Sequence, residues 1–249
     1  MKLFKQNITL VFTASIVGLI VSIVAQIFAL TAKYIYQLTI QDRVFSIFDI
    51  NIFEQKINIF PFFACLLASF LISILIKAYN IKRWHGPADT IYAAHQKAGT
   101  LDTKMGFNST LAAFLSISGG ASVGMYGPLV HFGGTLAAFL RRRPFIPNIP
   151  HDIIIGAGVA AAISAGFGSP IAGIVFAHEV VIRHFSMRAL TAISLSSIIS
   201  NFSADRINIV DPVLVLEPVS FDMFSAFPGL LIIGIISAVI AFIFMNSLL

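Results

Sequence analysis

The stretch LSISGGASVGMYGPLVHFGG, residues 115–134, joins two apolar segments through Gly119, Gly120, Gly124, Gly127 and Pro128. It stands inside residues 105–140, which contain no Asp, Glu, Lys or Arg. An uncharged block of this length is typical of a membrane segment, but a regular helix does not carry so much glycine and a proline at its centre. Broken backbone at membrane depth leaves N–H and C=O groups without partners unless protein or a water-filled cavity receives them. We therefore expect the break to line a site.

Pro128 indicates where the chain re-enters a helix, because proline suits the first helical turn, where its missing N–H would be unpaired anyway. We predict a half-helix from Leu129 to about Leu140. Its unpaired N–H groups and its positive dipole end would point into the bilayer, which favours an anion.

The composition places the chain in a membrane: 57% of the residues are hydrophobic and 11% are charged, with a mean hydropathy of +0.91. Soluble domains carry roughly 25% charged residues. The net charge of +5 comes from basic residues in short clusters between apolar runs, as in positive-inside loops, so we expect a lipid bilayer and no nucleic acid as partner. Cys65 is the only cysteine, which excludes an intrachain disulfide and disfavours a cysteine metal site.

Two uncharged runs, residues 6–32 and 57–76, are long enough to span a bilayer. The first must tilt or project, because about 27 residues at 1.5 Å each exceed a hydrocarbon core of ~30 Å. A polar connection, residues 33–56, joins them, and a last uncharged run covers residues 224–249.

Between these spans the apolar segments are short and interrupted. His85-Gly86-Pro87 opens a run over residues 90–98, and residues 166–170 break another before a proline-led half-helix over residues 171–182. A serine-rich run follows over residues 189–204. The fold class we predict is all-α: a polytopic membrane protein with tilted spanning helices and half-helices led by proline and glycine, the pattern of transporters built from inverted repeats.

Three motifs resemble those of the CLC family of chloride channels and proton/chloride exchangers. GMYGP at residues 124–128, continuing as VHFGG, resembles Gly-(Lys/Arg)-Glu-Gly-Pro, and HGP at residues 85–87 resembles a shortened Gly-Ser-Gly-x-Pro. AAAISAGFGSPIAGIVFAHE at residues 160–179 is similar to Ala-Pro-(Leu/Ile)-Ala-Gly-x-x-Phe-x-x-Glu. Together they cover about residues 57–185.

The resemblance implies a homodimer with one anion pathway per subunit, lying between two inverted halves. The 249 residues form a single transmembrane domain that we expect to be incomplete: residues 1–204 would be the first repeat, and residues 224–249 the first helix of a missing second repeat. The backbone expected to face the anion belongs to Gly86, Ala88, Gly124, Gly127 and Leu129.

Two departures from the family pattern bear on mechanism. The family's gating glutamate falls on Tyr126, whose side-chain pKa near 10 prevents proton cycling at neutral pH. The internal proton-transfer glutamate falls on Val180. We therefore predict passive anion movement without proton exchange, with Tyr126 at the gate position.

Other ionisable residues have more ordinary interpretations. Glu179 is expected to be structural, capping or pairing with Arg183. The offset of six between His178 and His184 does not fit the HExxH zinc motif, so we expect no metal, no cofactor and no enzyme. His131 is expected to be a packed, hydrogen-bonded histidine more than a proton relay. The basic run at residues 141–143 is expected to anchor a helix end.

The function that follows is chloride transport by a CLC-type voltage-gated channel in a membrane, with the bacterial inner membrane as the expected location. Two alternatives stay open. The same scaffold could carry another anion such as nitrate or fluoride, or the chain could be a truncated, non-conducting remnant.

Overall fold

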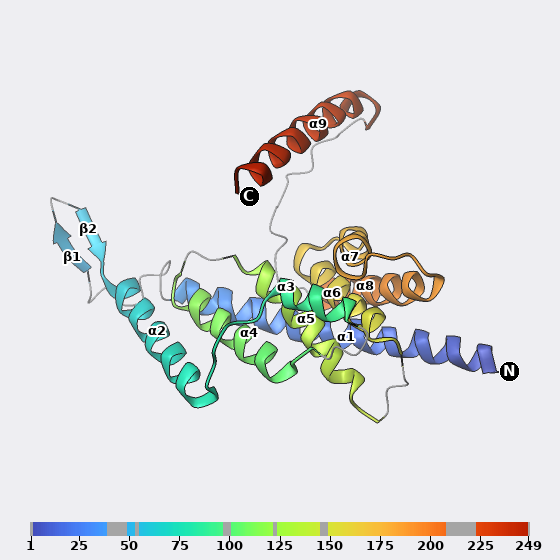
Figure 1. The fold of residues 1–249 in the computed structure, drawn as a ribbon. Helices are drawn as coiled ribbons and strands as arrows, with labels where there is room; N and C mark the ends of the chain where they lie inside the picture. Colours follow the sequence, from blue (N-terminus) through green and yellow to red (C-terminus); the bar gives the residue numbers. More distant parts are fainter. Residues whose placement is uncertain are drawn as a thin grey trace. The chain divides into compact units, whose positions relative to one another are not determined.

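The computed structural model describes residues 2–38, 49–52, 55–96, 101–121, 124–144, 149–207 and 223–248. Its elements are almost all helices, which confirms the predicted fold class (Figure 1). The exception is an antiparallel hairpin of β1 (Asp49–Ile52) and β2 (Gln55–Asn58), in the connection predicted only to be polar. In β1 isoleucine alternates with Asp and Asn, a period of two that favours a strand.

Three helices in the described residues are long and apolar enough to cross a membrane: α1 (Lys2–Tyr36), α2 (Phe60–Tyr79) and α9 (Met223–Leu248). The 35 residues of α1 reach about 52 Å at 1.5 Å per residue, so its predicted tilt or projection is required. The apolar side chains of α2 are mostly exposed, as expected of a lipid-facing helix. The chain divides into two compact units, Met1–Pro212 and Val213–Leu249, and α9 belongs to the second.

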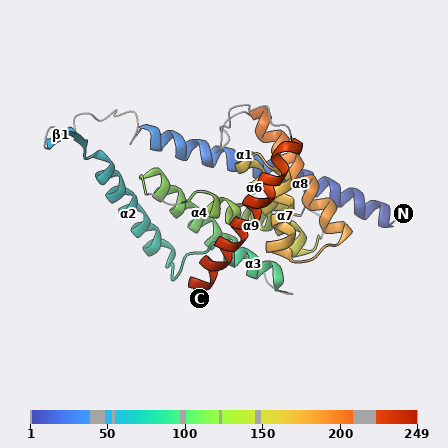
Figure 2. The same ribbon diagram turned by 90° about the horizontal axis from the view of Figure 1, so that it is seen from above.

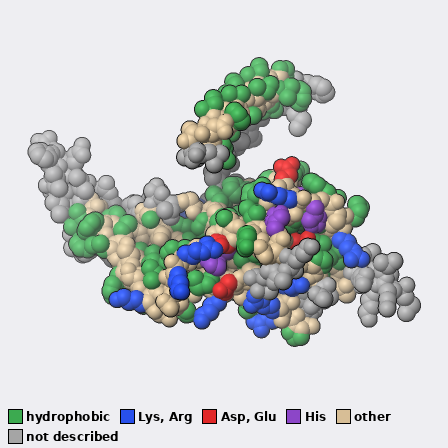
Figure 3. Space-filling view, viewed as in Figure 1, with side chains coloured by type: hydrophobic (Ala, Val, Ile, Leu, Met, Phe, Trp, Pro, Cys, Tyr) green, Lys and Arg blue, Asp and Glu red, His purple; other side chains and the backbone are tan. Residues whose placement is uncertain are grey.

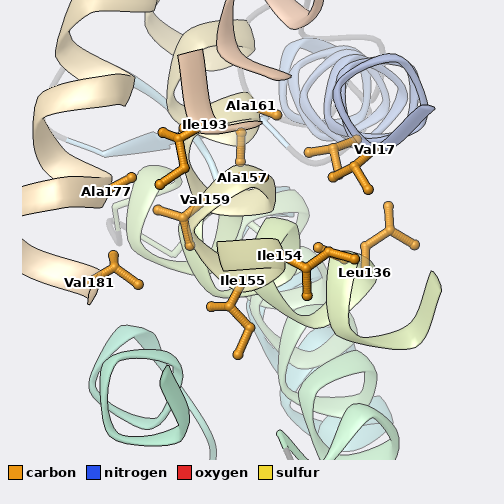
Figure 4. Close-up of a cluster of buried hydrophobic side chains, with 14 of the residues drawn as sticks. Val17, Leu136, Ile154, Ile155, Ala157, Val159, Ala161, Ala177, Val181 and Ile193 are labelled. Atoms are coloured by element: carbon orange, nitrogen blue, oxygen red, sulfur yellow. The ribbon is translucent and has the colours of Figure 1, made fainter. Parts of the chain in front are cut away.

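Helix α6 (His151–Phe167) is the centre of the larger unit, and it packs against α1, α5 (Tyr126–Arg141), α7 (Pro170–Phe176) and α8 (Met187–Ile207) (Figures 1 and 2). Its side chains are buried almost all round, as expected of a helix enclosed by others. Figure 4 shows Ile154, Ile155 and Val159 of α6 among Val17 of α1 and Ile193 of α8.

Small residues bring these helices into backbone contact. A Cβ atom at Gly133 of α5 would lie 2.5 Å from the carbonyl oxygen of Gly158 of α6. A Cβ atom at Gly18 of α1 would likewise overlap the carbonyl oxygen of Ser196 of α8. Such close crossings are how membrane helices pack when lipid removes the hydrophobic drive between them.

The serine-rich run explains how α8 is held against its neighbours. Ser196 and Ser200 of α8 donate hydrogen bonds of 3.0 and 2.7 Å to the carbonyl oxygens of Ala157 and Ala161 of α6. Ser164 of α6 donates at 2.8 Å to the carbonyl of Ser197 in return. These interhelical bonds satisfy hydroxyls that would otherwise be unpaired in a buried interface.

The predicted interruptions are present. Helix α4 (Thr103–Ser118) ends before the glycine-rich stretch and α5 begins at Tyr126, so residues 115–134 do not form one continuous helix. Helix α6 ends at Phe167, where Gly168 has a left-handed φ of 63°, and α7 starts with Pro170. The short α3 (Pro87–His95) also starts with proline.

Helix α7 runs into a π-helical segment, η3 (Ala177–Ile182), that the sequence pattern did not predict. The π geometry ends at Arg183, whose φ of 53° is left-handed. On the face of the larger unit seen in Figure 3, hydrophobic side chains are spread over the surface, and several Lys and Arg side chains lie in its lower half.

Candidate functional site

A cavity of about 320 Å³ lies where the N-terminal ends of α3 and α5 meet the middle of α4. Its walls include Gly86, Pro87, Ser109, Ser116, Gly124 and Pro128. Two segments that the sequence singled out, 38 residues apart, therefore line the same space. Among the described residues in its walls there is no Asp, Glu, Lys or Arg.

Glycine keeps the backbone open at both helix entrances. A Cβ atom built on Gly86 or on Gly124 would meet no heavy atom of the described residues within 4 Å. A Cβ atom on Gly127 would lie 3.8 Å from Cγ of Pro87, so the first turn of α5 approaches the first turn of α3. Because no side chain covers Gly86 or Gly124, a small ligand in the cavity can approach the main chain directly.

The unpaired amides of α5 differ from those expected. The helix begins at Tyr126 and not at Leu129, and the N–H of Leu129 already donates to the carbonyl oxygen of Met125 at 3.2 Å. Pro128 has no N–H. The first N–H groups of a helix have no acceptor within it, so the amides of Tyr126 and Gly127 have none in α5. Neither residue is among those that line the cavity, where this segment contributes Gly124, Pro128 and His131.

At α3 the expected amide is already occupied. The N–H of Gly86 donates at 2.9 Å to Oδ2 of Asp89, which closes a capping arrangement three residues into the helix. The same carboxylate forms an ion pair with Arg83. Ala88 is exposed, and it is absent from the residues that line the cavity. The contribution of α3 to the cavity is therefore its dipole and its open backbone, with the Gly86 N–H engaged inside the helix.

His131 belongs to the cavity wall and is almost completely buried, with 1% of its surface exposed. Its Nδ1 lies 2.6 Å from Oγ1 of Thr90, which is fully buried on α3. This confirms the packed, hydrogen-bonded histidine that the sequence predicted. Its Nε2 is buried without any hydrogen-bond partner in the described chain. The ring of His85 stands edge-on to that of His131, with centroids 6.3 Å apart.

Thr90 was not singled out from the sequence. Nothing in the local pattern marks it, because its partner lies 41 residues away and the contact requires α3 and α5 to pack together. A polar residue inside a short apolar half-helix is a weak signal that could have drawn attention to it.

Tyr126 sits at the N-terminus of α5, but its ring turns toward the end of α6. It stacks on Phe167 with centroids 3.9 Å apart and planes inclined by 26°, and it lies close to Gly166. Tyr126 is not among the residues that line the cavity between α3 and α5. Its role as a gate stays a prediction, and the packing role is the one visible in this conformation.

The acidic and histidine residues after Pro170 lie away from that cavity. Glu179 is exposed and forms no ion pair with Arg183 in the described chain, because the wider π turn and the left-handed Arg183 do not align residues four apart. His178 is fully buried, and its Nδ1 contacts the carbonyl of His184 at 3.0 Å. Val180 is partly buried in the same segment and has no group that binds a proton.

The arginines at the C-terminal end of α5 hold adjoining segments. Arg141 donates at 2.9 Å to the carbonyl oxygen of Ile149, and Arg142 donates at 3.0 Å to that of Leu101. Arg143 covers the ring of Phe139 at 4.4 Å. Cations at this end complement the negative pole of α5, whose positive pole faces the cavity.

Comparisons with known proteins agree with these features. The sequence model of the family described as voltage gated chloride channel matches residues 64–249. The chain is 24% identical over 146 residues to the voltage-gated ClC-type chloride channel ClcB of Salmonella typhi, covering 59% of this chain and 34% of that protein. It is 26% identical over 148 residues to ClcB of Escherichia coli O139:H28, covering 59% and 35%.

The aligned region thus spans about a third of the length of these curated relatives. The family match, by contrast, covers well over half of this chain and includes every residue of the cavity wall. With its apolar helices, the chain is an integral membrane protein that belongs to the voltage gated chloride channel family.

Proposed function

We propose that this chain carries small anions, chloride first among them, across a membrane. The observation that supports this most is the convergence of α3 and α5, with their positive ends, on one cavity whose described wall residues carry no charge. Partial positive charge from dipoles and amides attracts a dehydrated anion, and the absence of a full cation keeps binding weak enough for release.

We propose further that the movement is passive. An exchanger needs groups that gain and lose a proton along the anion's route. Tyr126 and Val180, the two positions that the family resemblance assigns to proton-handling acids, carry no carboxylate. Tyr126 moreover stacks on Phe167, which favours a packing role for its ring.

A homodimer remains part of the proposal. Apolar side chains of α7 and α8 stand exposed, among them Ile171, Ile198 and Phe202. Lipid or a second copy of the chain could cover them. Chemical crosslinking of the chain in vesicles at low protein density distinguishes these occupants, because lipid contact alone leaves the chain monomeric.

The transport proposal is tested by flux from liposomes that contain the purified chain. Efflux of chloride, nitrate and fluoride is measured with external pH recorded at the same time, and empty liposomes give the background. Gly124→Leu, which places a side chain in the open space at the cavity, is expected to reduce chloride efflux at least tenfold. Gly234→Leu in α9 is the matched control, because a Cβ atom there also meets no described residue within 4 Å.

Efflux without proton movement, sensitive to Gly124→Leu and insensitive to Gly234→Leu, supports the proposal. Efflux equal to that of empty liposomes leaves the non-conducting alternative. Chloride-driven proton uptake contradicts the passive mechanism while preserving anion transport. The order of the three anions decides between chloride and the alternative substrates.

A further inference from the structure

The feature that carries a further inference is the unpaired nitrogen of His131. The imidazole is 1% exposed, it lines the cavity, and its Nε2 has no partner in the described chain. A buried polar atom left without a partner is costly, so such an atom in a native structure calls for an explanation. Since Nδ1 contacts Thr90, Nε2 is the one nitrogen of this cavity-lining ring that has no partner in the described chain.

The contact with Thr90 decides whether Nε2 donates or accepts. A neutral imidazole carries its proton on one nitrogen and accepts at the other. The Thr90 hydroxyl makes no other hydrogen bond in the described chain, and it is fully buried, so its proton needs Nδ1 as an acceptor. With Nδ1 accepting from Thr90, the proton of the imidazole lies on Nε2.

We propose that the Nε2–H of His131 is a side-chain ligand of the anion in this cavity, held in the donor tautomer by Thr90. This inference rests on the proposed function and adds to it a residue that selects anions over cations. An N–H donor binds chloride and repels a cation, and a neutral donor adds no full charge that would trap the ion.

The charged groups nearby are compatible with an anion. The carboxylate of Asp89, the residue next to Thr90 in the sequence, is paired with Arg83 and accepts the N–H of Gly86. Its negative charge is therefore compensated at the entrance of α3. His131 lies in the second turn of α5, close to the positive end of the helix dipole, which also favours an anion.

The chain carries its own reporter for a binding measurement. Trp84 is the single tryptophan, it lines this cavity, and 38% of its surface is exposed. Iodide quenches indole emission by contact. Chloride bound in the cavity is expected to protect Trp84 from iodide in a saturable manner, with gluconate keeping the ionic strength constant. The full purified chain is used, in detergent or in vesicles, and no transport is required.

Three variants test the role of His131. His131→Leu removes the donor and is expected to weaken the apparent affinity for chloride roughly 10- to 100-fold, as loss of a hydrogen bond to a charged group does. His131→Gln retains an N–H donor and should stay within about threefold of the wild type, a difference below about 1 kcal/mol. Thr90→Val leaves the imidazole free to divide between its tautomers and is expected to weaken binding about two- to fivefold.

His95→Gln is the control, because His95 is an exposed histidine on the same short helix as Thr90 and its Nδ1 contacts only its own helix, at Ile91. It should bind chloride as the wild type does. If His131→Leu does not fold, the apparent chloride affinities of Thr90→Val and His95→Gln are compared instead. Weaker binding in Thr90→Val alone supports the role of His131, and equal binding in the two variants contradicts it.

The outcomes separate this inference from the proposed function. Saturable protection that is unchanged in both His131→Leu and Thr90→Val overturns the ligand role and leaves the anion site in place. Absence of saturable protection in the wild type overturns both. Protection that depends on His131 in a chain without flux supports the ligand role and removes only the transport function.

Discussion

The backbone contact between α5 and α6 can be tested by making the same substitution at Gly133, which forms it, and at Gly124, which does not. In Gly133→Ala the new Cβ atom would lie 2.5 Å from the carbonyl oxygen of Gly158 and 2.6 Å from Cβ of Ala162. Neither neighbour can rotate away, because one is backbone and the other is a single carbon. In Gly124→Ala the new atom would meet nothing within 4 Å in the part of the chain that the structure describes.

The expected magnitudes follow from these distances. Overpacking a well-packed interior costs about 1–3 kcal/mol, and a rigid partner favours the upper half of that range. Alanine recovers about 1 kcal/mol through its better helix propensity, so Gly133→Ala should lower the free energy of unfolding by about 1–2 kcal/mol. At about 2–4 °C per kcal/mol, the midpoint should fall by roughly 2–8 °C. Gly124→Ala should leave it unchanged or raise it slightly, since alanine restricts the unfolded chain.

The assay heats both variants and the wild type in one detergent and measures the fraction that stays monodisperse by size-exclusion chromatography. Equal midpoints for Gly133→Ala and Gly124→Ala would refute the backbone contact between α5 and α6. A lower midpoint for Gly124→Ala alone would refute the open space assigned to the cavity.

Three further changes test the surroundings of the site. Ser200→Ala removes a hydrogen bond from α8 to α6 and should destabilise the chain by about 0.5–1.5 kcal/mol, whereas Ser203→Ala, whose hydroxyl bonds within its own helix, should stay within about 0.5 kcal/mol in the same melting assay. Asp89→Ala releases the N–H of Gly86 and removes a carboxylate, so the apparent affinity for chloride, measured by protection of Trp84 from iodide, should rise about threefold or more. A lower affinity would contradict the claim that Asp89 keeps the Gly86 amide from the anion. Tyr126→Phe keeps the ring stacked on Phe167 and should leave chloride flux within about twofold of the wild type. A larger loss of flux would show that the Tyr126 hydroxyl acts at the gate position.

The sequence alone predicted the breaks because they depend on local chemistry. Glycine and proline restrict where a helix can start or stop whatever surrounds them, and the interruptions after Ser118 and Phe167 lie where the pattern placed them. The start of α5 was misplaced from Tyr126 to Leu129 because Pro128 is compatible with several positions in a first turn. The capping of Gly86 by Asp89 could have been expected, since an acidic residue three positions into a helix is a known signal.

Features that depend on packing between distant segments could not be predicted. The pair of Thr90 and His131 exists only because α3 lies against α5, and the turn of Tyr126 toward Phe167 depends on where α6 ends. The π-helical segment before Arg183 has no sequence rule that separates it from an ordinary helix. Local chemistry thus predicted the scaffold of the site, while tertiary contacts decide which of its donors are free.

The measurement that tests the central claim most directly is anomalous diffraction from crystals of the full chain grown or soaked with bromide. We predict a bromide peak in the cavity between α3 and α5, beside Gly124 and within hydrogen-bonding distance of Nε2 of His131. A cavity without a peak, in crystals where bromide binds only at the protein surface, would contradict the claim that these helix ends receive a dehydrated anion.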